Sequence, residues 1–252
     1  MLPMCSRGPA SMAIIKATRT TKHKRKFHCP TINSLPKELL INVLGLVASV
    51  SFTDVFNAKL SCKDFLEVAG EDYIFQHVSL EKFPIIPCRI TKEASYFLNR
   101  CEQFGNPESL FRQGVIDYFS LMRMESGLEF LKRASEKGHL EATYVYGIAL
   151  LCSQSKQEGL KILSFLKRTQ SRGLKECRKR IRIAIRCMWI RNFIIVKQQA
   201  LCSCEKPCQV LKKIRGWESN NNELDEDDDT LCEVCSCNCE VTWFSDMLRG
   251  KV

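Results

Sequence analysis

The chain has 252 residues, of which 45% are hydrophobic and 26% charged, and its formal net charge is +10. This composition excludes a wholly disordered chain, because it matches that of folded globular proteins. No stretch approaches the roughly 18 apolar residues of a membrane span, and the first residues lack the apolar core of a secretory signal. We therefore expect a nuclear and/or cytoplasmic protein that does not bind a membrane.

The charge is divided among three segments. Residues 1–33 carry seven Lys or Arg and no acid, and residues 172–191 carry eight against one glutamate. Residues 223–229 carry six acids and no base. Because these runs partly cancel, the net charge is weak evidence for nucleic-acid binding, and each run needs its own explanation.

Residues 1–33 show no apolar periodicity and contain a basic run at 22–26. We expect a disordered basic arm. Three interpretations stay open for it: a nuclear-import signal, a contact with nucleic acid, or a solvated tail without a partner.

Residues 34–83 have the spacing of short amphipathic helices. Apolar residues recur on one helix face from Leu39 onward, and Ser34 can cap this helix. The pattern breaks over 49–53, a long inter-helix turn is expected over 47–53, and a second helix begins near Asp54. Because a domain this small buries only a modest core, we expect an apolar surface left for a partner.

A run of motifs crosses this segment. They are Leu35-Pro36-x-Glu38-Leu39-Leu40-x-x-Val43-Leu44, the helix start Asp54-Val55, Cys62-Lys63-x-Phe65 and a closing aromatic near Phe75. Together they resemble the F-box, a motif that docks on a Skp-type adaptor and through it on a cullin-based ubiquitin ligase. The resemblance implies an adaptor-binding surface formed by Leu35, Pro36, Leu39, Leu40, Val43 and Leu44. An ordinary helical hairpin with core leucines is the alternative.

Residues 84–200 contain an internal repeat. Two aromatic-x-x-Gly patterns, at 111–114 and 144–147, are offset by 33 residues, and two Gly-Leu-x-x-Leu patterns, at 127–131 and 159–163, are offset by 32. Glycine lets two helices approach closely. The spacing therefore predicts two helix pairs that stack on one another.

The junction between the two units is Ala134-Ser135-Glu136-Lys137-Gly138-His139-Leu140-Glu141-Ala142. It resembles the junction of Sel1-like repeats, relatives of tetratricopeptide repeats. Such arrays need about three stacked units for stability, so we expect flanking helices at 92–104 and 174–196 to complete the stack. The resemblance implies a concave surface for a protein ligand, and a scaffold without a ligand is the alternative.

A basic helix follows the repeats. Five cations share one of its faces: Lys175, Arg178, Lys179, Arg182 and Arg186. An exposed charged face is one interpretation, and contact with an acidic partner, including 223–229 of the same chain, is another. Nucleic-acid binding is the weakest, since Trp189 and Phe193 suit a core better than a stacking platform.

Residues 201–252 form a cysteine-rich acidic tail. Seven of the fifteen cysteines lie here, as Cys202-x-Cys204-x3-Cys208 and Cys232-x2-Cys235-x-Cys237-x-Cys239. Thiolates at Cys-x2-Cys spacing hold zinc from a tight turn. The candidate ligands of one structural zinc are Cys232 and Cys235 with either Cys204 and Cys208 or Cys202 and Cys208. Free thiols without metal, and disulfides or redox sensing, remain open.

The segment 241–248 places four apolar residues on one helical side, so we expect it to pack on the repeats: Trp243, Phe244, Met247 and Leu248. The order of the parts is similar to that of plant F-box proteins with Sel1-like repeats and a cysteine-rich tail.

No motif for catalysis is present, and none of the four histidines adjoins a nucleophile in a suitable setting. The sequence predicts an all-α protein with parts at 1–33, 34–83, 84–200 and 201–252. We expect a non-catalytic subunit of an SCF-type ubiquitin ligase, without a required cofactor, that recruits an unidentified protein substrate. A nuclear nucleic-acid-associated protein and an F-box scaffold outside a ligase are the alternatives.

Overall fold

The structure is a computed structural model that describes residues 32, 35–85, 90–153, 155–193 and 232–250. The chain divides into two units, Met1–Leu35 and Pro36–Val252. In the first unit only Ile32 and Leu35 are described, and both side chains are exposed. The basic run at 22–26 lies outside the described residues.

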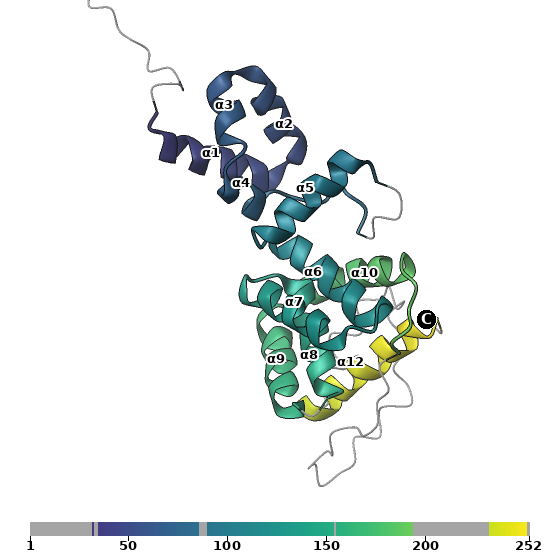
Figure 1. Ribbon diagram of the computed structural model, residues 1–252. Helices are drawn as coiled ribbons and strands as arrows, with labels where there is room; N and C mark the ends of the chain where they lie inside the picture. Colours follow the sequence, from purple (N-terminus) through teal and green to yellow (C-terminus); the bar gives the residue numbers. More distant parts are fainter. Residues whose placement is uncertain (1–31, 33–34, 86–89, 154, 194–231, 251–252) are drawn as a thin grey trace, which may run out of the picture. The chain divides into compact units, whose positions relative to one another are not determined.

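The described part of the second unit is helical and contains no strand, which confirms the all-α prediction (Figure 1). None of its helices is both long and apolar enough to cross a membrane. In chain order the helices are α1 (Lys37–Val50), α2 (Phe52–Ser61), α3 (Lys63–Val68), α4 (Asp72–His77), α5 (Lys92–Gln103), α6 (Pro107–Val115), the π-helical turn η2 (Ile116–Ser120), α7 (Met124–Glu136), α8 (Leu140–Leu151), α9 (Lys156–Thr169), α10 (Ser171–Arg186) and α12 (Glu233–Leu248).

Helix α1 runs without a break to Val50. Ser51 then adopts an extended backbone, and its hydroxyl accepts a hydrogen bond from the Asp54 amide, which caps α2. The long turn predicted over 47–53 is therefore wrong, because the helix continues through its β-branched residues until the Ser51 cap ends it. Ser34, the predicted cap of α1, lies outside the described residues.

Helices α1–α4 share a hydrophobic core with α5. The Phe97 ring of α5 stacks on Phe83 at 5.5 Å and meets the edge of Phe52 at 5.1 Å. The prediction that α5 flanks the repeats agrees with its contact to α6, where the Ser109 hydroxyl donates to the Leu98 carbonyl oxygen at 3.5 Å, although its apolar face packs on this first core. The buried members of the core are Leu40, Leu44, Ala48, Val55, Val68, Ala69, Ile74, Val78, Leu80 and Cys101.

Two helix pairs, α6–α7 and α8–α9, repeat the same local geometry. Gly105 and Gly138 have φ angles of +74° and +82° and end the helices before each pair. Asn106 and His139 follow, and each side chain caps the next helix. The offset of 33 residues seen in the sequence is thus one structural repeat.

Glycines mark where the helices of each pair cross. A Cβ atom added to Gly127 would lie 2.7 Å from the backbone nitrogen of Tyr118. A Cβ added to Gly159 would lie 2.6 Å from the backbone nitrogen of Leu151. No side chain fits at either position, which confirms that these glycines allow the close approach.

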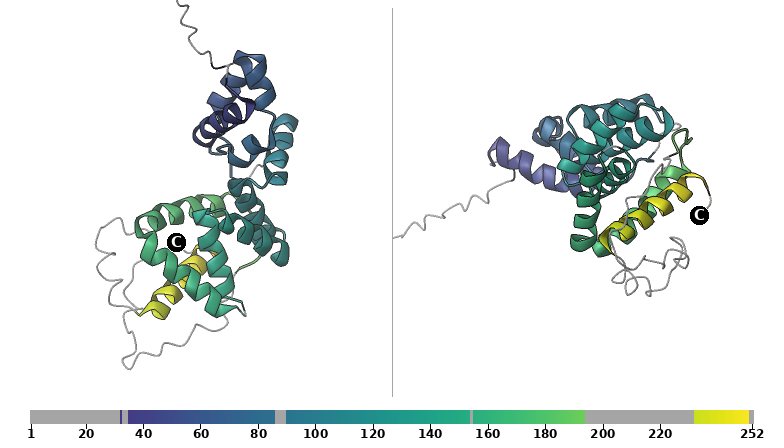
Figure 2. Two further views of the ribbon diagram at one scale, coloured as in Figure 1. Left: turned by 90° about the vertical axis from the view of Figure 1, so that its left-hand side faces the viewer. Right: turned by 90° about the horizontal axis from the view of Figure 1, so that it is seen from below.

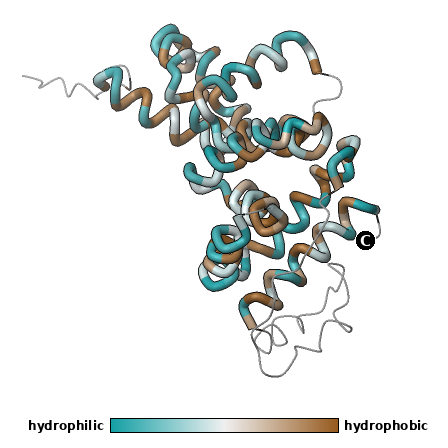
Figure 3. Tube along the Cα trace, turned by 60° about the horizontal axis from the view of Figure 1, so that its bottom comes forward, coloured by the Kyte–Doolittle hydropathy of each residue, from teal (hydrophilic) through white to brown (hydrophobic). Residues whose placement is uncertain are grey.

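Helices α10 and α12 complete a second core with the repeats. In two further views α12, drawn in yellow, lies against α8, α9 and α10 (Figure 2), and apolar residues recur along it (Figure 3). The prediction that 241–248 packs on the repeats is confirmed, although the helix begins at Glu233. Its buried members of the core are Cys237, Val241, Phe244, Met247 and Leu248.

Candidate functional site

Helix α1 presents two apolar faces, of which only one is covered. Leu40, Leu44 and Ala48 lie in the core. The opposite side carries four exposed apolar residues at i, i+4, i+7 and i+11, which places them in a single row. We call this row the α1 stripe, and it consists of Leu39, Val43, Leu46 and Val50, with exposed fractions from 42 to 79%.

The structure separates the predicted adaptor-binding residues. Leu39 and Val43 belong to the α1 stripe, whereas Leu40 and Leu44 are 6% and 1% exposed. Because buried side chains cannot touch a partner without unfolding, Leu40 and Leu44 hold α1 in place. The exposed residues beside them are the ones that a partner can contact. Leu35 belongs to the first unit and is exposed.

The first turn of α1 is fixed by its flanks. Pro36 occupies the N-cap position, with no side-chain hydrogen bond to the helix. Lys37 Nζ lies 2.8 Å from a Glu67 oxygen and 2.9 Å from a Glu71 oxygen. These ion pairs are solvent-exposed, so they orient α1 more than they stabilise it.

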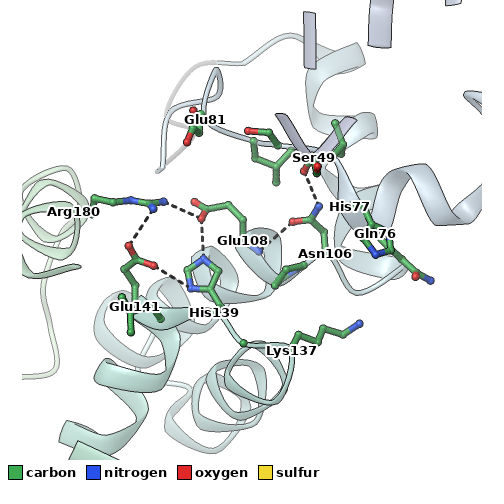
Figure 4. Close-up of a pocket in the computed structure, with 16 residues that line it drawn as sticks. Ser49, Gln76, His77, Glu81, Asn106, Glu108, Lys137, His139, Glu141 and Arg180 are labelled. Carbon is green, nitrogen blue, oxygen red and sulfur yellow. Dashed lines mark hydrogen bonds and ion pairs between the residues drawn. The ribbon is translucent and has the colours of Figure 1, made fainter. Parts of the chain in front are cut away.

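A pocket of about 550 Å³ opens where the segment after α4 meets the N-terminal ends of α6 and α8 (Figure 4). Asn106 joins these parts, because its side-chain amide donates to the carbonyl oxygens of Phe75 and Val78 at 3.0 and 2.9 Å. The Arg112 guanidinium adds bonds to three more carbonyl oxygens of the same segment, those of Leu80, Phe83 and Pro84.

Two carboxylates at equivalent repeat positions line this pocket. Glu108 and Glu141 each stand in the first turn of their helix, where a negative charge is favoured. Arg180 of α10 lies between them, 3.3 Å from a Glu108 oxygen and 3.1 Å from a Glu141 oxygen. His139 Nε2 lies 2.9 Å from Glu108, while Nδ1 accepts from the Ala142 amide. The cluster ties two repeats to α10.

The surroundings of Glu108 shift the pKa of its carboxyl. Burial alone would raise the pKa of its carboxyl, but the hydrogen bond from His139 and the charge of Arg112 outweigh burial and lower the pKa to about 2. The Arg112 Nε donates to the same carboxylate at 2.8 Å. A group held ionised by paired cations suits an anchoring role better than proton transfer.

One member of the basic face predicted for α10, Arg178, turns inward and pairs with Glu240 of α12. Arg180, which lies outside that predicted face, pairs with Glu108 and Glu141. Part of the positive charge is thus neutralised by acids of the same chain. The acidic run 223–229 lies outside the described residues.

The tail cysteines are described only in part. Cys204 and Cys208 lie outside the described residues. Cys232 caps α12 by accepting a hydrogen bond from the Cys235 amide at 3.4 Å, and Cys235 is buried. The described residues hold no cluster of three or more potential metal ligands, so a four-cysteine site needs ligands from outside them and stays a prediction.

The sequence did not predict the two buried ion clusters, at Glu108 and at Glu240. The only local signal was the 33-residue offset between Glu108 and Glu141. Nothing local pairs Glu240 with Arg178, because 62 residues separate them.

Comparisons with known proteins agree with both cores. Residues 80–186 match the family of plant tetratrico peptide repeats. The putative F-box protein At1g67623 of Arabidopsis thaliana is 33% identical over 217 residues, covering 81% of this chain and 73% of that protein. The F-box protein At2g35280 of the same plant is 27% identical over 141 residues, 56% of this chain and 86% of the relative. No solved structure matches.

Proposed function

The chain belongs to the F-box proteins, and from this premise we propose that it is a non-catalytic substrate-recognition subunit of an SCF-type E3 ubiquitin ligase. Its first helices would dock on a Skp-type adaptor and through it on a cullin. Its repeats would hold a protein target while other subunits transfer ubiquitin.

The observation that carries this proposal is the α1 stripe. Four apolar side chains in one row on an exposed helix face are costly to leave in water. Full burial of such a side chain contributes roughly 1.5–3 kcal/mol, and each of these four gains the share that corresponds to its exposed part. Contiguous exposed apolar surface of this kind marks a site of protein association. The opposite face of α1 is already packed in the core, so a partner covers the stripe without rearranging the helix.

Co-purification tests the proposal. The full chain is mixed with a purified plant Skp-type adaptor and a cullin and separated by size-exclusion chromatography. We expect one peak that contains all three proteins. A peak of chain and adaptor without cullin would favour the alternative of a scaffold outside a ligase, and failure to bind the adaptor would refute both.

A nucleic-acid-associated role is the second candidate from the sequence. It predicts binding that weakens steeply as salt is added. The internal pairing of Arg178 and Arg180 leaves less basic surface for phosphates than the sequence alone indicates, so we favour the ligase subunit.

A structural zinc in the tail remains part of the proposal. The position of Cys232 and Cys235 at the start of α12 suits a Cys-x2-Cys half-site, with Cys204 and Cys208 as the other half. Metal analysis of the full chain under reducing conditions should give about one zinc per chain. The Cys232→Ser, Cys235→Ser variant should lose it and a Cys187→Ser variant should keep it; a metal-free wild type refutes the site.

A further inference from the structure

Helix α12 packs against α8, α9 and α10, and we call their facing surfaces the groove of these helices. The residues in contact are far apart in the sequence. The hydrogen bonds of α12 to α8 and α10 join residues 62 to 96 positions apart. Phe244 is fully buried, with its ring 5.8 Å from that of Phe119 and 6.2 Å from that of Tyr144. The groove therefore accepts a helix that approaches from elsewhere in the chain.

A buried carboxylate anchors this helix. Glu240 is 1% exposed. One of its oxygens accepts from Tyr144 Oη at 2.7 Å and from Arg178 Nε at 3.2 Å, and the other accepts from Arg178 Nη2. Lys167 Nζ lies 3.8 Å from the second oxygen. Helices α8, α9 and α10 thus each supply one polar group to a single carboxylate.

An anchor of this kind contributes more to which helix is accepted than to the stability of the fold. A buried ion pair gains little over apolar residues of the same shape, because desolvation offsets the attraction. It does penalise a helix that lacks the carboxylate, since the cation would then be buried alone. Burial strongly disfavours ionisation of Tyr144, raising its pKa well above the usual value, so its hydroxyl remains a donor.

Helix α8 is built to be covered on a second side. Nine of its twelve residues are buried, and α10 and α12 pack against it in addition to its neighbours α7 and α9. An uncovered α8 would expose apolar side chains beside the cationic pair of Arg178 and Lys167. This combination fits a helical ligand with one acidic residue between apolar ones.

We propose that the groove of α8, α9 and α10 is a receptor for a helix that presents one carboxylate between apolar side chains, and that α12 is its intramolecular occupant. The inference rests on the proposed function and deepens it: a target protein carrying such a helix enters this groove in place of α12.

The test uses full chains and a labelled peptide of residues 232–250, with binding followed by fluorescence anisotropy. In a Glu240→Lys chain the resident helix loses its anchor, and we expect the peptide to bind this chain about tenfold or more tightly than the wild type, the scale set by breaking a buried ion pair. A Glu233→Lys chain, which carries the same charge change at an exposed position of α12, should behave as wild type. A peptide carrying Glu240→Lys should not bind.

Equal peptide binding by the three chains overturns the proposal. A dimer of the Glu240→Lys chain in light scattering also overturns it, because the occupant would then be a second copy. Should the Glu240→Lys chain fail to fold, hydrogen exchange of the wild type decides: we expect α12 amides to exchange through an opening that leaves α8 protected. If the α12 amides exchange only together with those of α8, α12 is a permanent part of the fold and the proposal is overturned.

Adaptor binding is measured on the same preparations. If the chains bind the adaptor but the Glu240→Lys chain does not bind the peptide, the groove proposal is contradicted and the proposed function is not. If the Glu240→Lys chain binds the peptide but no chain binds the adaptor, the proposed function is contradicted and the groove proposal is not.

Discussion

Arg178 and Arg180 stand two residues apart on α10 but pair with acids in different parts of the fold. Arg178 meets Glu240 of the last helix, and Arg180 meets Glu108 and Glu141 of the repeats. The sequence predicts the helix and its charge from local spacing. It could not predict these partners, because they are set by packing between segments 39 to 72 positions apart.

The depressed pKa of Glu108 makes stability depend on pH. A carboxyl whose pKa falls from its ordinary value near 4.5 to about 2 on folding stabilises the fold at neutral pH. This contribution is lost as pH falls from about 5 toward 2, and it amounts to about 3 kcal/mol. We expect Glu108→Gln to lower the free energy of unfolding at pH 7 and to flatten its decline below pH 5, measured by urea titration.

A Glu125→Gln variant is the control, because Glu125 is exposed and its loss should leave the acid-dependent decline intact. An equally steep decline in the Glu108→Gln variant would show that other groups cause it.

The repeat helices are the elements that the sequence predicts best. Periodic apolar residues and paired glycines act within one or two turns, so the offsets of 33 and 32 residues appear directly in the sequence. The length and amphipathic pattern of α5 do not show that its apolar face joins the first core. Aromatic contacts of Phe97 with Phe52 and Phe83 decide that.

The α8–α9 crossing should not tolerate a methyl group. Gly159→Ala places a Cβ 2.6 Å from the Leu151 nitrogen and 2.8 Å from the Gly147 oxygen, which are backbone atoms that cannot turn aside. We expect a loss of about 1–3 kcal/mol in the free energy of unfolding. Chemical denaturation followed by circular dichroism measures it.

Gly173→Ala is the matched control, since its Cβ would meet the movable tip of Leu140 at 3.1 Å. Equal stability of the two alanine variants would mean that the α8–α9 helices are not held at this distance.

For the whole molecule, the sequence predicts the all-α class and the order of the parts. It does not predict how the F-box segment meets the repeats. Asn106 and Arg112 bind backbone carbonyls there, and because every residue has a backbone carbonyl, the sequence does not mark which ones accept these bonds. This junction joins the two cores through hydrogen bonds that a sequence cannot display.

Arg112→Leu should weaken the junction. Three carbonyl oxygens of 80–84 lose their donor, and each buried unsatisfied group costs about 1–3 kcal/mol. We expect a lower melting temperature and separate unfolding of the two cores in calorimetry. Arg133→Leu, at an exposed position of α7, should melt as wild type; an unchanged Arg112→Leu variant would contradict a coupling through this side chain.

The most direct test of the docking role is a calorimetric titration of a Skp-type adaptor with a Leu39→Asp, Val43→Asp chain. Both side chains are exposed in the free protein, so the fold should survive while adaptor affinity falls by about a hundredfold or more, as expected for charges at a buried apolar interface. The matched control is Phe165→Asp with Ile183→Asp, which alters two equally exposed apolar residues outside the α1 stripe. Adaptor affinity of the stripe variant equal to that of the control and the wild type would contradict docking through α1.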